Sequence, residues 1–226
     1  MTYLEEKDIS LLVKSGDHDK VKMVVRHAER PVFKGLKAPH EVSITEHGKK
    51  DAERLGRLLR QYGLSVDGCA SSPVRRCIQT AEFIAEGNQY HGKVETSPSL
   101  GGSGLFMDDG EALDHTLDTC TIEEIIGSQL AGNKVPGMRD LEEGLRIFMG
   151  RVLSDQSIDF EVFVSHDLFV CPAVHYLTET SYSAKGNTGF LEGFFISVGN
   201  DRTKILWDTH WYDVTDRLGS LFRKEA

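Results

Sequence analysis

The segment Arg26-His27-Ala28-Glu29-Arg30 places a histidine between two arginines. An imidazole nitrogen can attack phosphorus and hold the phosphoryl group covalently, which divides one difficult displacement into two easier ones. Guanidinium groups match the oxygens of a transferring phosphoryl group better than the ammonium of lysine does. We therefore interpret His27 as a nucleophile, with Arg26 and Arg30 as phosphate-binding residues. The alternative is a surface turn of solvated charges.

A second histidine, His166, is followed directly by Asp167. Each histidine comes after a short apolar run rich in β-branched residues, at 21–25 and at 161–165, which is typical of a buried strand. In open α/β sheets, ligands bind outside the carboxyl ends of the strands. We therefore expect His27 and His166 at the same sheet edge, within reach of each other.

The elements that must position these residues alternate between strands and helices, which predicts a three-layer α/β/α sandwich with a mainly parallel central sheet. A long loop rich in glycine and aspartate is expected at 97–114. Apolar periodicity and capping residues predict helices at 3–14, 45–63, 78–87, 121–132, 139–153 and 215–223, and strands at 21–25, 68–72, 93–96, 161–165, 193–199 and 204–208.

The composition fits one domain over residues 1–226, with 39% hydrophobic and 27% charged residues. A net charge of -9 argues against binding to nucleic acid or to an anionic membrane surface, and no apolar run is long enough to span a membrane. One stretch is basic: residues 21–37 contain Lys22, Arg26, Arg30, Lys34 and Lys37 against one acid, Glu29. A small cationic site in an acidic chain suits a small anion.

The cysteines, Cys69, Cys77, Cys120 and Cys171, have neither CxxC pairing nor metal-ligand spacing. We expect small buried hydrophobic residues in a reducing compartment, and the N-terminus does not have the pattern of a secretory signal. The expected location is cytoplasmic. No metal and no cofactor are predicted.

Four segments, taken in order along the chain, resemble the histidine phosphatase superfamily, which includes the cofactor-dependent phosphoglycerate mutases. RHAER resembles its RHG signature, and Thr45-Glu46-His47-Gly48 resembles its LTxxG segment. The run SSPVRRCIQTA at 71–81 resembles SSPLxRAxQTA, and Val164-Ser165-His166 resembles the strand of the second histidine. The resemblance implies a phosphoglycerate mutase-like fold, a phosphohistidine on His27, and a phosphate pocket that includes Arg76 and His166.

Two features depart from the family pattern. Ala28 stands where the family usually has glycine, which serves either an unusual backbone angle or a close ligand approach. The glutamate proton donor of the mutase-like branch has no recognisable counterpart at 100–111. The His166-Asp167 pair instead resembles the acid-phosphatase branch, so we interpret Asp167 as the general acid, with a helix cap as its alternative role. Competing donors are Asp108, Asp109 and Glu111.

The function expected from these residues is metal-independent phosphohydrolysis of a small phosphorylated metabolite through a phosphohistidine on His27. The alternatives are a mutase of the same fold, a phosphate-binding module without turnover, and a metal hydrolase with His166 and Asp167 as ligands. Substrate choice is expected in loop insertions near 31–44 and 97–120, with His40, His47 and His115 as residues that could contact substrate. The sequence does not define the substrate or the oligomeric state.

Overall fold

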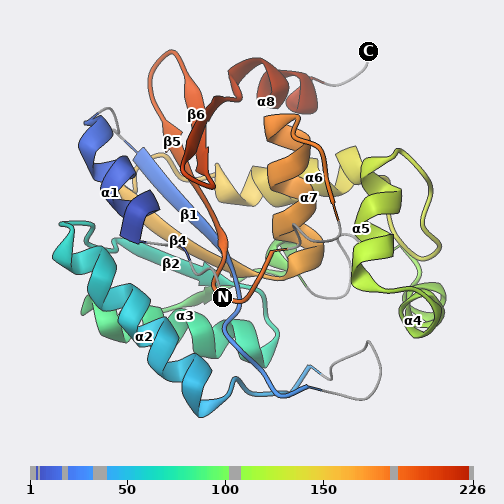
Figure 1. Cartoon of the computed structure of the whole chain (residues 1–226), viewed down its shortest axis with the longest axis horizontal. Coiled ribbons are helices and arrows are strands. Elements are labelled where there is room, and N and C mark those ends of the chain that lie inside the picture. The colour runs from blue at the N-terminus through green and yellow to red at the C-terminus, as the bar shows by residue number, and fades with distance from the viewer. Residues whose placement is uncertain are drawn as a thin grey trace.

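The computed structural model describes residues 4, 6–16, 20–32, 40–101, 108–183 and 188–223, and its centre is a seven-stranded sheet of order β3-β2-β4-β1-β5-β6-β7 (Figure 1). The strands are β1 (Lys20–Arg26), β2 (Gly68–Ser71), β3 (Glu95–Thr96), β4 (Phe160–Ser165), β5 (Gly193–Val198), β6 (Thr203–Trp207) and β7 (His210–Asp213). The predicted parallel arrangement holds between β3, β2, β4 and β1. The C-terminal strands pair antiparallel, so the sheet is mixed.

The parallel half of the sheet aligns three strand ends. Arg26, the last residue of β1, pairs in register with Ser165, the last residue of β4. Ser71, the last residue of β2, pairs with Val164. The residues that follow these three strands therefore leave the sheet at one edge, as the sequence predicted for His27 and His166.

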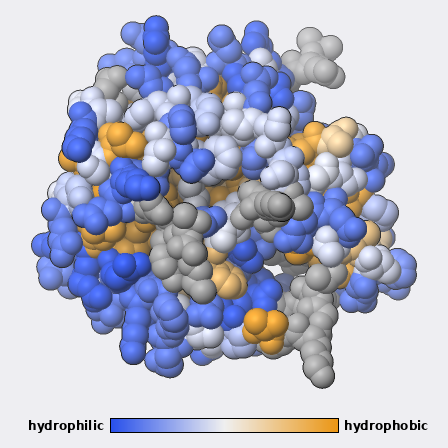
Figure 2. All heavy atoms as spheres, in the orientation of Figure 1, coloured by the Kyte–Doolittle hydropathy of each residue, from blue (hydrophilic) through white to orange (hydrophobic). Residues whose placement is uncertain are grey.

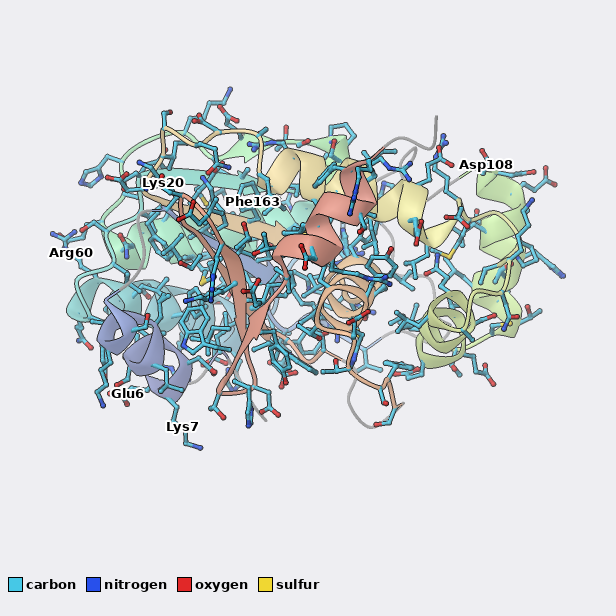
Figure 3. All side chains as sticks on the ribbon, turned by 90° about the horizontal axis from the view of Figure 1, so that it is seen from above. Glu6, Lys7, Lys20, Arg60, Asp108 and Phe163 are labelled. Carbon is cyan, nitrogen blue, oxygen red and sulfur yellow. The ribbon has the colours of Figure 1, made fainter. Side chains whose placement is uncertain are left out.

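Two hydrophobic clusters cover the two faces of the sheet, which confirms the three-layer sandwich. One face packs against α1 (Glu6–Ser15), α2 (Glu46–Gln61) and α3 (Arg75–Asn88). The other packs against α4 (Gly110–Thr119), α5 (Ile122–Leu130), α6 (Leu141–Val152), α7 (Asp167–Thr178) and α8 (Thr215–Phe222). Phe163 of β4 lies inside the molecule between these layers, whereas Asp108 lies at the periphery beside α4 (Figure 3).

The long loop expected at 97–114 is partly wrong. A 3-10 turn, η1, forms at Pro98–Leu100, and α4 begins at Gly110. Asp109 caps α4 by accepting from the amides of Glu111 and Ala112, so this acidic stretch begins a helix. The capping box predicted at Thr121 and Glu124 is confirmed.

Parts of both expected substrate loops, at 33–39 and 102–107, lie outside the described residues. In the described part of the chain, no helix has the length and apolar character that crossing a membrane requires. The face seen in Figure 2 is largely hydrophilic, with hydrophobic residues scattered between polar ones.

Candidate active site

The two histidines meet where β1 and β4 end. The ring centroids of His27 and His166 are 5.5 Å apart, and both side chains are buried. The amide of His27 donates to the carbonyl oxygen of Ser165, which extends the β1–β4 pairing by one residue. The structure thus brings together the two histidines that the sequence predicted at one edge.

The hydrogen bonds of His27 define which ring nitrogen is free to react. Its Nδ1 lies 2.8 Å from the carbonyl oxygen of Ala28, which can only accept, so Nδ1 carries the proton. Its Nε2 accepts from Nε of Arg76 at 3.1 Å. Neutral His27 therefore presents the Nε2 lone pair towards the arginines, as a nucleophile for an anionic centre must.

Burial and nearby positive charge keep both histidines neutral. Burial lowers the pKa of His27 well below its ordinary value, and His166, Arg26 and Arg76 lower it further. Burial also lowers the pKa of His166, followed by the charges of Arg76 and Arg26. An imidazole must be neutral to attack, so this environment suits a nucleophile at and below neutral pH.

The predicted phosphate-binding arginines surround His27. Arg26 pairs with Asp167, with Nη2 2.7 Å from Oδ2, and its Nη1 donates to the carbonyl oxygen of Thr188. Burial lowers the pKa of Arg30, and Arg26 lowers it further by like-charge repulsion. Burial likewise lowers the pKa of Arg76, with Arg30 and Arg26 among the further causes. Three guanidinium groups lie close enough to repel one another, which a bound anion would relieve.

Two helices begin at this edge and add to its affinity for anions. Helix α3 begins two residues after Pro73, and α7 begins directly after His166. The N-cap residues, Val74 and His166, make no side-chain capping hydrogen bond. Helix N-termini carry partial positive charge, so two of them at one edge favour a phosphate group.

Among the predicted donors, Asp167 is the one that the structure places beside the arginines of this edge. It pairs with Arg26, and its charge is felt by both Arg30 and Arg76. By contrast, Asp109 is the N-cap of α4, and Asp108 and Glu111 are exposed. The undescribed segments at 33–39, 102–107 and 184–187 contain no aspartate or glutamate.

Ala28 fits the site without backbone strain. It is absent from the non-glycine residues with positive φ, and its methyl group packs in the hydrophobic cluster beneath α1, α2 and α3. Its amide donates to Oγ1 of Thr80, whose hydroxyl donates to the carbonyl oxygen of Arg76. These two hydrogen bonds tie the segment around His27 to α3. A glycine at this position could serve an unusual backbone angle or a close ligand approach, and only the second reason can apply here.

The segment that resembles LTxxG fastens α2 to the nucleophile turn. Thr45 caps α2, and its hydroxyl donates to Glu29, whose backbone oxygen accepts from the amide of Thr45. A Cβ at Gly48 would lie 2.6 Å from that oxygen, so only glycine permits this approach. The side chain of Glu29 thus accepts from a threonine hydroxyl.

Several charged residues predicted near the site lie elsewhere. Lys22 is fully buried near the start of β1, where it pairs with Glu161, so it does not belong to the anion site. His47 is exposed and pairs with Asp51, and His115 is exposed on α4. His40 lies close enough for its charge to lower the pKa of His166. Lys34 and Lys37 lie outside the described residues.

The sequence analysis did not predict the aromatic side chain that lies beside His27. The Phe190 ring lies 5.6 Å from the His27 ring, and Cζ of Arg26 lies 4.6 Å from its centroid. The next residue, Leu191, is buried with φ +56°, a conformation that leucine rarely adopts. Arg26 holds this turn through backbone hydrogen bonds with Leu191 and Glu192. None of the four segments that resemble the family contains Phe190, so no motif in the sequence indicated it.

Comparison with known proteins agrees with this geometry. The family model for the histidine phosphatase superfamily (branch 1) matches residues 23–102, which contain His27, Arg30 and Arg76. A broad-specificity phosphatase of Saccharomyces cerevisiae is 30% identical over 102 residues, which are 44% of this chain and 43% of that protein. The sequence is thus similar to the histidine phosphatase superfamily over residues 23–102. The matched region spans less than half of the yeast relative.

Solved structures of phosphatases share this fold at low sequence identity. A mycobacterial glucosyl-3-phosphoglycerate phosphatase has a TM-score of 0.59 and 16% identity, over 84% of this chain and all of that one. A mutant phosphoserine phosphatase of Entamoeba histolytica, in complex with phosphoserine, has a TM-score of 0.52 and 17% identity, over 86% and 94% of the two chains. These likenesses support the phosphoglycerate mutase-like fold.

Proposed function

We propose that this protein is a phosphatase that transfers the phosphoryl group of a small phosphate monoester to Nε2 of His27 and then to water. The observation that carries the proposal is the orientation of His27. Its Nδ1 is committed to the carbonyl oxygen of Ala28, and its Nε2 faces the guanidinium of Arg76. Known phosphatases among the relatives and structural neighbours support the same activity.

In the first step, Nε2 of His27 attacks phosphorus and the bond from phosphorus to the leaving oxygen breaks. Arg26, Arg30 and Arg76 stabilise the charge on the phosphoryl oxygens. The carboxyl group of Asp167 gives its proton to the leaving oxygen, so the product is a neutral alcohol. Arg76 must move off Nε2 when substrate binds, because its Nε occupies that lone pair in the free site.

In the second step, a water molecule attacks phosphorus and gives a proton to the carboxylate of Asp167. The bond between phosphorus and Nε2 breaks, and its electron pair returns to the imidazole. Phosphate leaves, and His27 is again neutral. Asp167 pairs with Arg26 in the free site, so we propose that Arg26 turns to the phosphoryl oxygens on binding and leaves Asp167 able to take a proton.

The substrate class follows from the charge and size of the site. Three arginines are crowded at one edge of a chain whose net charge is -9, which favours a small anion over a polyanion. All four cysteines are free, and three are buried, which supports a reducing compartment such as the cytoplasm. Ala28 in place of glycine and the uncertain proton donor are the two features that favour a binding module without turnover, and the ordinary backbone angle of Ala28 weakens the first.

The test is hydrolysis of p-nitrophenyl phosphate by the wild type and by His27→Ala, each with and without a chelator. We expect turnover by the wild type that the chelator leaves unchanged, and loss of turnover in the variant. Full activity of His27→Ala would refute covalent catalysis at His27. Loss of wild-type activity with the chelator alone would refute the metal-independent mechanism, and no turnover on a broad panel of phosphate esters would refute the phosphatase proposal.

A further inference from the structure

The second histidine has one ring nitrogen in a fixed polar contact and the other turned to the arginines. Nε2 of His166 lies 2.9 Å from Oγ of Ser72, and Nδ1 lies 3.4 Å from Nη2 of Arg76. Ser72 follows β2 and is fully buried. This contact joins residues 94 positions apart in the chain, so it is a product of the fold.

The hydroxyl of Ser72 has one proton, and the structure shows where it goes. Oγ lies 2.5 Å from the carbonyl oxygen of Gly101, which can only accept. Ser72 therefore donates to Gly101 and has only lone pairs left for other partners. The amide of Val74 donates to one of them at 3.3 Å, and Nε2 of His166 lies against the other.

The position of Gly101 depends on its being glycine. Its φ is +122°, and a Cβ there would lie 2.4 Å from Cδ2 of His166. The preceding carbonyl oxygen, of Leu100, accepts from the hydroxyl of Ser165. Two serine hydroxyls at the ends of β2 and β4 thus hold η1 against the His166 ring.

From this proton count we infer that Ser72 is a positioning residue that fixes His166 in the tautomer with its proton on Nε2. Nδ1 then presents a lone pair to the phosphate site, and Arg76, which can only donate, satisfies it in the free protein. When a phosphoryl anion takes the place of Arg76 at Nδ1, it binds together with one proton. That proton lies between an oxygen of the anion and Nδ1 of His166. This inference rests on the proposed phosphate site.

The groups that face His166 are a neutral thiol near Nε2 and a set of charged or titratable side chains. Cys77 lies 3.5 Å from Nε2, and burial raises the pKa of its thiol to about 12, so it stays neutral. The charged and titratable neighbours come from four parts of the fold: Arg26 and His27 at the end of β1, Arg30 and His40 in loops, Arg76 and Cys77 on α3, and Asp167 on α7.

The first test reads the tautomer directly and does not require turnover. Long-range proton–nitrogen correlation spectra of the ligand-free protein show which ring nitrogen of His166 carries the proton. We expect the Nε2 tautomer in the wild type and a mixture of tautomers in Ser72→Ala. The matched control is Ser71→Ala, which removes a buried hydroxyl that donates to the backbone carbonyl oxygen of Ser72 rather than to His166. This control should keep the wild-type tautomer.

The second test counts protons taken up when sulfate binds, by calorimetry in buffers of different ionisation enthalpy. Sulfate brings no proton at neutral pH, so the wild type and Ser71→Ala should take one up from solvent, and Ser72→Ala should take up less. We also expect kcat/KM for p-nitrophenyl phosphate to fall about 10-fold or more in Ser72→Ala only.

A wild-type His166 with its proton on Nδ1, or equal spectra for Ser72→Ala and Ser71→Ala, would overturn the inference. Equal proton uptake by these two variants would also overturn it. The failure of the proposed function looks different: the wild type would then hydrolyse no phosphate ester, whatever the tautomer of His166.

Discussion

Both ends of the parallel strands contain buried charge, but the balance of charge among the described residues differs between them. Near the start of β1 and β4, Lys22 and Glu161 are register partners with a 3.0 Å ion pair, and Lys22 also donates to the carbonyl oxygens of Asp155 and Ile158. Arg151 pairs with Glu161 and with Glu95, so two cations meet two carboxylates. All three protons of the lysine ammonium group thus have an acceptor.

At the opposite end, the described residues place Arg26, Arg30 and Arg76 with the carboxylate of Asp167, beside two buried imidazoles. The comparison teaches that burial of charge does not by itself identify a catalytic site. A balanced set stabilises the fold, whereas a set with excess charge of one sign needs a ligand of the other sign. The following predictions test this division of roles.

The largest effect is expected at the proposed donor. Asp167→Asn should reduce kcat for an alkyl phosphate by roughly 10²–10⁴-fold, because a general acid contributes about that much. The loss should be smaller for p-nitrophenyl phosphate, whose leaving group needs less protonation. Steady-state kinetics with both substrates check this.

Asp109→Asn is the matched control for the donor, since asparagine also caps helices well and Asp109 caps α4. It should leave kcat and stability nearly unchanged. A greater loss of kcat in Asp109→Asn than in Asp167→Asn would show that the donor assignment is wrong.

At the balanced end, Lys22→Met should lower the free energy of unfolding by about 3–5 kcal/mol, because it removes one partner of a buried ion pair. Denaturant unfolding measures this loss. The kcat of the folded fraction should stay close to that of the wild type. Adding Glu161→Leu should recover much of the stability, and a double variant no more stable than Lys22→Met would contradict the balance argument.

The opposite pattern is expected for Arg76→Met at the edge with excess charge. The variant should lose roughly 10²–10³-fold in kcat/KM, since it removes one donor to the transferring group. Its free energy of unfolding should be equal to or higher than that of the wild type, because repulsion from Arg26 and Arg30 is relieved. Strong destabilisation with full activity would reverse the roles assigned to the two ends.

Sulfate should stabilise the free enzyme by filling the same edge. At about 100 times its Kd, it should raise the free energy of unfolding by about 2.7 kcal/mol. Thermal unfolding measures the shift, and Arg76→Met should show less of it. The same shift in both proteins would place the anion elsewhere.

The stability of the anion-free protein should depend on pH through His27 and His166. Both have pKa values lowered well below 6.5 in the folded state. As the pH falls below about 6.5, the unfolded chain takes up protons that the folded protein refuses, so stability is lost. The Tm should fall from pH 7 to pH 5, and less steeply in His27→Ala. A flat profile would mean that these histidines titrate normally.

Short-range patterns were enough to predict the sheet edge where the two histidines meet. His27 and His166 each follow an apolar β-branched run, and parallel strands bring such ends together, so order along the chain implied proximity. Lys22 was misplaced because it is close to His27 in sequence. A strand rises about 3.3 Å per residue, so the five steps from Lys22 to His27 cover most of the length of β1.

Features that depend on tertiary approach had no local signal. The pairing of Ser72 with His166 and Gly101 joins strand ends that meet only after folding. Strand β7 pairs only with β6 at the sheet edge, and its four residues have little apolar periodicity. Helix α7 contains Pro172, and a proline inside a sequence segment argues against a continuous helix. The helix nevertheless continues through Pro172, where its residues are buried in the core.

Trapping the covalent intermediate tests the central claim most directly. Asp167→Asn should slow attack by water on the phosphoenzyme, so a reaction with p-nitrophenyl phosphate quenched in alkali should retain the labile bond to histidine. Mass spectrometry of the peptides should find one phosphoryl group on His27 and none on His166. Turnover with no phosphoryl group on His27 at any time, in the wild type or in the variant, would contradict the account.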